Sequence, residues 1–161
     1  PGEDEHSFAS GFDRLVLMGL AELQVNRLKG LPGTPWRPIP QPGDGFSPCP
    51  PYDLLFSEHL SFEDLARMQR FALAWDRLHN RGQFRHTLPL LWRNPTRSPY
   101  ACIQTLAEAM VRKEGRLHAI GTHAWAQCLW RHLVRSSEAA ATRAREALHL
   151  DGIPDGVLDR P

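Results

Sequence analysis

The segment SFEDLARMQRFALAWDRLHNRG, residues 61–82, decides the fold class. Its apolar residues recur three or four positions apart, which is the spacing of one face of an α-helix. Ser61 and Asp64 form a capping-box pattern at the start, and Gly82 is suited to end the helix. The positions expected to face inward are Phe62, Leu65, Met68, Ala72, Trp75 and His79. The segment therefore predicts a helix over 61–82 with one buried face.

Three segments closer to the C-terminus show the same periodicity. Ser98 followed by Pro99 matches an N-cap and first helical residue, and Gly115 would close that helix. An alanine-rich helix is expected over 137–148, starting at Ser137. A third helix, between these two, should begin at Thr122. Its inward-facing residues are expected to be Trp125, Cys128, Leu129, His132 and Leu133. Residues 58–150 thus predict a helical domain, followed by a tail over 151–161.

The N-terminal part of the chain has a different pattern. Ser7 can cap a helix that ends at Gly19. Further on, Leu23 and Val25 alternate with polar residues, and this period of two predicts a short strand within 20–31. A helix followed by a strand indicates an α/β element over residues 1–35.

A proline-rich segment separates the two parts. Residues 32–51 hold eight of the 14 prolines, so neither a helix nor a central strand can continue through them. We expect a linker or a long ordered loop over 36–57. The predicted fold class is mainly α, a small helical domain preceded by a short α/β remnant.

Composition limits the classes of partner. The 161 residues include 19 Lys and Arg against 18 Asp and Glu, a formal net charge of +1. Nucleic acid and anionic membranes attract a concentrated positive excess, so neither is an expected partner. No apolar run approaches the roughly 18 residues that cross a bilayer. Cys49, Cys102 and Cys128 are widely spaced and form no C-x-x-C pair, which is typical of a reducing, cytoplasmic location.

The sequence alone supplies no active site. His118, His123 and His132 are the closest histidines, but their spacing does not place them on one helical face. Cys102 and Cys128 occupy apolar helix positions and should be buried, which leaves Cys49 as the exposed thiol. We therefore expect neither a catalytic residue nor a metal ligand in this chain.

The end of the 61–82 segment combines aromatic, acidic, amide and basic side chains. These residues are Trp75, Asp76, Arg77, Asn80 and Arg81. One interpretation is a substrate or partner surface that recognises an anion. The other is a helix cap formed by the amide, with a solvated arginine face, which the near-zero net charge favours. Both interpretations stay open on the sequence.

Two sets of spaced residues match a known family together. The first set is Pro1–Asp4, Ser7–Phe8, Gly11–Leu15, Glu22–Val25 and Leu28–Pro35. The second is Pro50–Leu55, Arg67–Phe71, Trp75–Asp76, Asn80, Gly82 and Phe84. The first resembles the end of the radical SAM barrel in cobalamin-binding-domain radical SAM proteins. The second resembles the C-terminal helical domain of those proteins, which is itself a domain of unknown function.

The resemblance implies a larger parent enzyme. Such a parent carries an N-terminal cobalamin-binding domain and a partial (β/α) barrel whose C-x-x-x-C-x-x-C loop holds a [4Fe-4S] cluster, and it cleaves S-adenosylmethionine reductively to a radical. The three cysteines here are 53 and 26 residues apart and cannot form that loop. The cluster, the cobalamin and the S-adenosylmethionine are therefore expected of the parent, and no cofactor is expected in this chain.

The resemblance also implies site residues. In that family the strand that corresponds to 23–28, and the turn after it, lie near the bound S-adenosylmethionine. The implied adenosine contacts are Leu28, Leu31, Gly33 and Thr34. Two positions depart from the family pattern: Asn26 stands where a glycine is expected, and Arg81 stands where a serine commonly precedes the glycine.

The leading hypothesis is a C-terminal fragment of a cobalamin-dependent radical SAM enzyme, whose helices cover the barrel mouth and shape the substrate pocket. Pro1, in place of Met, agrees with a longer natural sequence. Its partners would be the cobalamin-binding and radical SAM domains of the same polypeptide, while the substrate is not indicated. An unpaired barrel strand would also favour a homodimer. The alternative is a free-standing helical adaptor that binds a protein or an anion through Trp75, Arg77 and Arg81.

Overall fold

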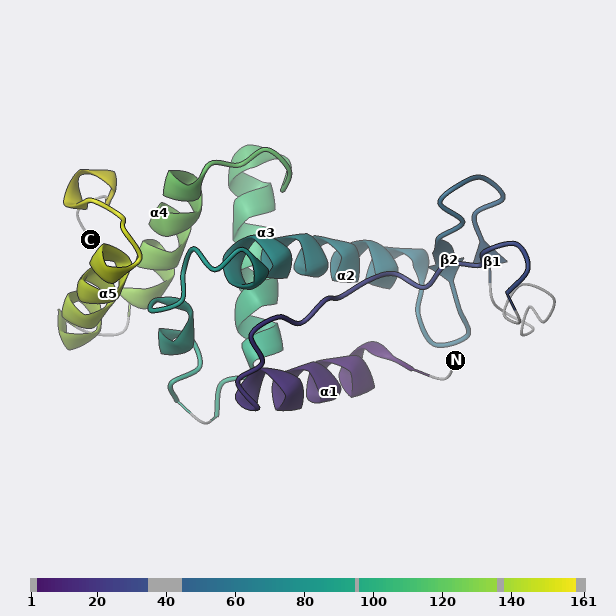
Figure 1. The fold of residues 1–161 in the computed structure, drawn as a ribbon, viewed down its shortest axis with the longest axis horizontal. Helices are drawn as coiled ribbons and strands as arrows, with labels where there is room; N and C mark the ends of the chain where they lie inside the picture. Colours follow the sequence, from purple (N-terminus) through teal and green to yellow (C-terminus); the bar gives the residue numbers. More distant parts are fainter. Residues whose placement is uncertain (1–2, 35–44, 95, 136–137, 159–161) are drawn as a thin grey trace.

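The computed structural model of the protein describes residues 3–34, 45–94, 96–135 and 138–158. In this part of the chain the fold is mainly helical, as the sequence predicts, and it also contains a small antiparallel sheet (Figure 1). Residues 36–44 of the predicted loop, and Ser137, lie outside the described residues. The elements in chain order are α1 (Glu5–Leu17), β1 (Gly45–Phe46), β2 (Leu54–Phe56), α2 (Phe62–Trp75), the π-helix η1 (Asp76–Asn80), the 3₁₀ turn η2 (Leu88–Leu90), α3 (Pro99–Glu114), α4 (Thr122–Leu133), α5 (Glu138–Leu150) and the 3₁₀ turn η3 (Asp155–Val157).

One hydrophobic core joins α1 to the later helices. α1 and α2 both cross α3, and α4 packs between α3 and α5 (Figure 1). Phe12 of α1 meets Phe71 and Trp75 of α2 edge to face, with ring centroids 4.8 Å apart in each pair. The largest side chains buried in the core are Trp75, Trp125, Trp130, Phe71, Phe84, Leu78, Leu91, Ile103, Leu106, Met110, Leu129 and Leu148. Burial of each large apolar side chain contributes roughly 1.5–3 kcal/mol, so this cluster is the main source of stability.

The helix ends follow local side-chain chemistry. Ser61 caps α2 as predicted, because its Oγ accepts from the Asp64 amide at 3.2 Å while Asp64 accepts from the Ser61 amide at 2.9 Å. Ser98 caps α3, and that helix ends at Gly115 with φ 69°. The prediction that Ser7 caps the first helix is wrong. Asp4 is the N-cap of α1, and Ser7 is the third helical residue that completes the same capping box.

The predicted helix over 61–82 changes geometry at its end. α2 stops at Trp75 and continues as the wider π-helix η1, in which the Arg81 amide donates to the Asp76 carbonyl five positions back at 3.2 Å. Gly82 then takes the left-handed conformation with φ 67°. Because a π-turn adds a residue to the helical turn, it changes the face on which the following side chains project.

The strand predicted within 20–31 is wrong, although the alternation behind it is real. Leu23 and Val25 are half-buried against the helical core, and the residues that alternate with them, Glu22, Gln24 and Asn26, are exposed. The segment is extended, and among the described residues it pairs only through one bridge between Lys29 and Asp53. A period of two records which side chains face inward and does not show whether the neighbour is a strand or a helix. Here the neighbour of Leu23 is a pair of side chains at the end of α2.

The sheet lies in the described half of the predicted loop over 36–57. β1 and β2 are antiparallel, and the Leu54 amide also donates to the Leu28 carbonyl at 2.9 Å. Leu54, Leu60 and Leu65 form a second, smaller buried cluster beside the start of α2. No helix within the described ranges is both long and apolar enough to cross a lipid bilayer.

Candidate functional site

Trp75 and Asn80 hold the backbone of Leu23. The Trp75 indole Nε1 donates to the Leu23 carbonyl at 2.7 Å, and the Asn80 Nδ2 donates to the same oxygen at 3.2 Å. The Asn80 Oδ1 accepts from the Leu23 amide at 3.2 Å. Both backbone groups of one extended residue are thus bonded by side chains, as a neighbouring strand would bond them. We call Leu23, Trp75 and Asn80 the backbone clamp.

His79 packs beside the backbone clamp. Its ring stacks on Trp75 with a centroid separation of 4.1 Å and an interplanar angle of 10°. Its Nδ1 lies 3.2 Å from the Asn80 Oδ1, which therefore faces both the His79 ring and the Leu23 amide. The stack and this contact fix the orientation of Trp75 and Asn80 toward Leu23.

Arg77 projects from η1 to the start of α4. Its Nη2 donates to the Thr122 hydroxyl at 2.9 Å, and that hydroxyl donates to the Gln83 Oε1 at 3.1 Å. The Nε of Arg77 is buried without a hydrogen-bond partner in the described part of the chain. The same is true of the indole Nε1 of Trp125, which is a fully buried side chain on α4.

The predicted partner surface at 75–81 divides into buried and exposed members. Trp75 is 1% exposed, and Asn80 is bonded inside the chain. Asp76 and Arg81 form an ion pair at 3.1 Å, with about half of each side chain exposed (50% and 58%). The exposed part of this segment is the ion pair, while Arg77, His79 and Asn80 are half-buried.

The second predicted group lies near the other end of α2. Leu28 and Leu31 are exposed, at 41% and 45%, and the Thr34 hydroxyl donates to the Leu31 carbonyl at 2.7 Å. Gly33 has φ 82°, which an L-residue with a side chain rarely adopts. Arg27, just before this group, donates to the Leu65 carbonyl in the first turn of α2 at 3.3 Å. Leu31, Gly33 and Thr34 therefore share one turn, Leu28 lies in the extended segment just before it, and the length of α2 separates all four from the 75–81 group.

A polar cluster that the sequence did not indicate connects three helices. Glu5 of α1 accepts hydrogen bonds from Arg67 of α2 through Nε at 3.2 Å and through Nη2, and from the Tyr100 hydroxyl of α3 at 2.8 Å. The hydrogen bond from Arg67 lowers the pKa of Glu5, and burial raises the pKa of Tyr100. Glu5 lies 62 and 95 residues from its two partners, so no local sequence pattern could have shown this cluster.

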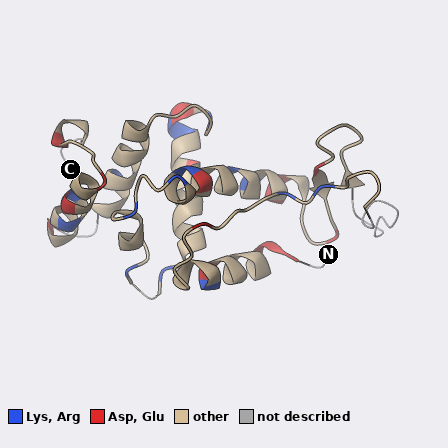
Figure 2. Cartoon of the chain, in the orientation of Figure 1, with Lys and Arg blue, Asp and Glu red and all other residues tan. Residues whose placement is uncertain are grey.

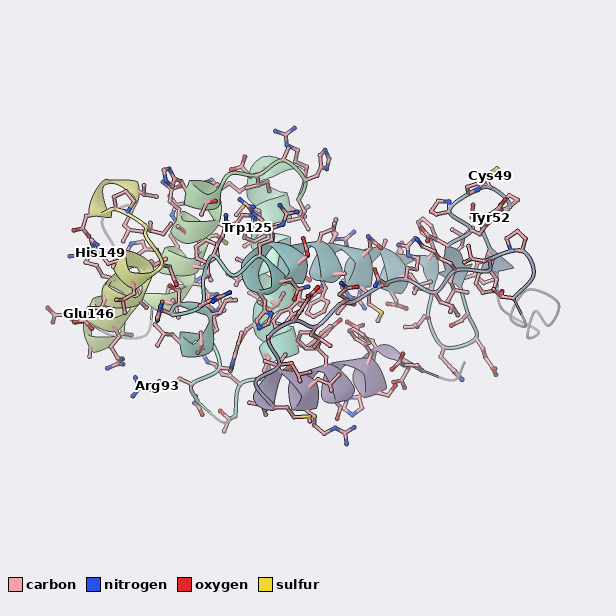
Figure 3. The ribbon with its side chains drawn as sticks, in the orientation of Figure 1. Cys49, Tyr52, Arg93, Trp125, Glu146 and His149 are labelled. Carbon is pink, nitrogen blue, oxygen red and sulfur yellow. The ribbon has the colours of Figure 1, made fainter. Side chains whose placement is uncertain are left out.

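The three cysteines differ in exposure. Cys49 is exposed on the loop between β1 and β2, as predicted (Figure 3). Cys102 is buried and Cys128 is half-buried, and burial raises the pKa of both thiols. Across the described ranges, no group of three or more His, Cys, Asp or Glu side chains is placed to hold a metal ion.

Comparison with known proteins identifies a family. The family described as "Protein of unknown function (DUF4080)" matches residues 43–154, a range that includes the sheet and α2 to α5. Comparison with curated proteins gave no match, and comparison with solved structures gave none either. The matched range covers well over half of the chain and contains both Trp75 and Asn80 of the backbone clamp. The chain therefore belongs to the DUF4080 family of proteins of unknown function.

Proposed function

We propose that the chain is the C-terminal part of a cobalamin-dependent radical SAM enzyme, located in the cytoplasm. Its helices form an accessory domain at the barrel mouth and have no catalytic activity of their own. The parent polypeptide binds the S-adenosylmethionine, the [4Fe-4S] cluster and the cobalamin. The observation that carries the proposal is the resemblance of two residue sets, the second of which falls inside the family match over 43–154.

Exposed apolar side chains in the N-terminal part of the chain form a surface that another domain could cover. They lie at the end of α1 and along the extended segment that follows it: Leu15 (39%), Leu17 (70%), Met18 (71%), Leu20 (39%), Leu28 (41%) and Leu31 (45%). Apolar area removed from water contributes about 25 cal/mol per Å², so a neighbouring domain would bind this surface favourably. In the proposed parent the neighbour is the radical SAM barrel. In the separate chain, the same surface favours a homodimer.

The adaptor alternative has less support from the geometry. It requires Trp75 at a partner surface, whereas Trp75 is 1% exposed and its indole N–H is bonded to Leu23. Arg77 and Arg81 keep their charge near the surface, so anion binding does not depend on Trp75.

The mass of the native protein tests the parentage directly. An antibody raised against this chain should detect, in a lysate of the source cells, a band several times heavier than 18.2 kDa. A band near 18 kDa would contradict the proposal. In that case the helical chain would act by itself or through separate partners.

Substitutions in the 28–34 turn test the proposed adenosine contacts. In the intact parent enzyme, the double substitution Leu28→Asp with Leu31→Asp should weaken S-adenosylmethionine binding at least tenfold, or about 1.4 kcal/mol. Leu150→Asp is the matched control, because Leu150 is 69% exposed on α5. All three leucines are exposed in this chain, so these changes should not disturb its folding. Unchanged binding in the double variant would remove these residues from the site without deciding the parentage.

A further inference from the structure

Two buried N–H donors lack an acceptor in the described part of the chain. They are the Nε of Arg77 and the indole Nε1 of Trp125. An unsatisfied buried donor costs roughly 1–3 kcal/mol, and native proteins leave few of them. Two on neighbouring elements therefore indicate an acceptor other than the described residues.

One donor is on η1 and reaches the start of α4, and the other is in the first turn of α4. Arg77 contacts the first residue of this helix, because its Nη2 donates to the Thr122 hydroxyl. Trp125 lies three positions after Thr122 and so on the same face, and helical side chains lean toward the N-terminus of their helix. Figure 3 shows Trp125 between α3 and α4, beside the end of α2 from which Arg77 projects. Trp125 is also in the buried cluster that contains Trp75 and Leu78 of that end.

The electrostatics of this end of α4 favour an anion. Gly121, the N-cap, has no side chain to bond the first-turn amides, and no acidic residue follows in that turn. Those amides carry the positive end of the helix dipole. Arg77 brings a positive charge to this end of the helix, because its Nη2 donates to the hydroxyl of Thr122, the first helical residue. Figure 2 shows acidic and basic residues side by side at the end of α2, as at the end of α3 and on α5, so the preference for an anion comes from the first-turn amides and Arg77 and not from a local excess of charge.

We propose that the start of α4 binds a small oxyanion, a phosphate or a carboxylate group. The Arg77 guanidinium, the Trp125 indole N–H and the first-turn amides of α4 are its donors. A guanidinium and a helix N-terminus bind both anions, so the shared chemistry is an oxygen-bearing anion that accepts several hydrogen bonds. The site does not depend on the radical SAM parentage, because all its residues are in this chain.

Nuclear magnetic resonance observes both donors directly. In ¹⁵N-labelled protein, side-chain Nε–H signals of arginine and indole N–H signals of tryptophan are resolved from the backbone amides. Inorganic phosphate and acetate are added in separate titrations, with chloride replaced so that ionic strength stays constant. The Arg77 and Trp125 side-chain signals should shift together with the Thr122 and His123 amides, and the shifts should saturate. The anion that saturates at the lower concentration identifies the preferred class.

Three substitutions distinguish specific anion binding at the start of α4 from a general effect of net charge. Arg77→Gln should weaken anion binding at least tenfold, and Trp125→Phe should weaken it severalfold while it keeps most of the buried ring. Arg81→Gln is the matched control, because it removes the same charge from an exposed residue that is already paired with Asp76. The backbone spectrum of each variant shows whether it folds.

Several outcomes would contradict the proposed anion site. Equal losses in the Arg77 and Arg81 variants would mean that only net charge matters. Full affinity in Trp125→Phe would mean that the indole N–H does not touch the anion. If neither anion shifts the Arg77 and Trp125 side-chain signals, the two donors bond to buried water instead and the site does not exist. If Arg77→Gln fails to fold, the wild-type titration and Trp125→Phe still decide the question.

Discussion

Asn80 occupies, for one residue of the chain, the place that a neighbouring strand would occupy. Its carboxamide donates to the Leu23 carbonyl and accepts from the Leu23 amide, and Trp75 adds a second donor to the same carbonyl. The extended segment after α1 is thereby attached to the end of α2 without any sheet. This attachment depends on two side chains, so single substitutions can test it.

Replacing Asn80 by alanine should release Leu23. The change removes two hydrogen bonds at a half-buried position and should lower the free energy of unfolding by roughly 1–3 kcal/mol. Asn26→Ala is the matched control, because Asn26 is exposed, and its effect should stay within about 0.5 kcal/mol. Urea denaturation followed by tryptophan fluorescence measures both. Equal effects of the two substitutions would show that the bonds to Leu23 add no stability.

Glu5 gives the protein a pH-dependent increment of stability. Its pKa is lowered by the hydrogen bond from Arg67, so folding favours the charged carboxylate. The stabilisation is complete above the ordinary carboxyl pKa of 4.5 and is lost as pH falls through the lower pKa of the folded state. At pH 7, Glu5→Gln should lower the free energy of unfolding by about 1–2 kcal/mol. The gap between variant and wild type should narrow toward pH 3.

Urea denaturation at several pH values checks this expectation. Glu3→Gln is the control, because it makes the same change in net charge at an exposed position. A gap between Glu5→Gln and wild type that stays constant from pH 7 to pH 3 would contradict the assignment of the stabilisation to the charged form of Glu5.

At the scale of the element, two helical glycines should respond to alanine with opposite signs. Gly115 ends α3 with φ 69°, where an L-residue is strained by about 1 kcal/mol. Gly11 lies inside α1, and a Cβ there would meet nothing within 4 Å. Gly115→Ala should therefore destabilise by about 1 kcal/mol, whereas Gly11→Ala should stabilise by roughly 0.5–1 kcal/mol. Thermal unfolding of both variants shows the signs, and a neutral Gly115→Ala would refute the strain argument.

The elements that could be predicted from sequence are those that depend on neighbouring residues. Ser61, Ser98 and Gly115 mark helix ends because capping involves residues within one turn. The π-helix at the end of α2 could not be predicted, because its hydrogen bonds run between residues that also suit an α-helix. The alternation around Leu23 predicted an extended backbone correctly and a strand wrongly, since its partner lies 57 positions away in Asn80.

The candidate sites were predictable only in their residue types. A basic and aromatic group at 75–81 was visible in the sequence, but the pairing of Arg77 with Thr122, 45 positions later, was not. Trp125 was expected in the core and is there, although its unpartnered N–H depends on the three-dimensional packing. The turn at 28–34 was found through the resemblance and not through any spacing rule.

At the scale of the whole molecule, the family match and the folding unit do not coincide. The match begins at residue 43, whereas α1 lies before it and supplies Phe12 to the core. α1 also contributes Asp13, whose Oδ1 accepts from the Tyr100 amide at the start of α3 at 2.7 Å. The matched range by itself would leave the aromatic faces of α2 and α3 in water.

A shortened chain should therefore lose its cooperative folding. Removing residues 1–42 exposes the rings of Phe71, Trp75 and Tyr100, which contact Phe12 in the intact chain. We expect a broad thermal transition and binding of a hydrophobic dye, as in a loosely packed helical state. Removing residues 1–3 alone, ahead of the cap Asp4, should leave the transition sharp. A sharp transition in the 43–161 chain would show that α1 is dispensable.

The backbone clamp also has a consequence for how homologues diverge. Asn80 and Trp75 bond only the amide and carbonyl of Leu23, and every amino acid except proline presents both groups. Position 23 can therefore exchange one apolar side chain for another while position 80 keeps its carboxamide. In an alignment of relatives, the invariant member of this contact would be the asparagine, and its partner would be recognisable only by the absence of proline.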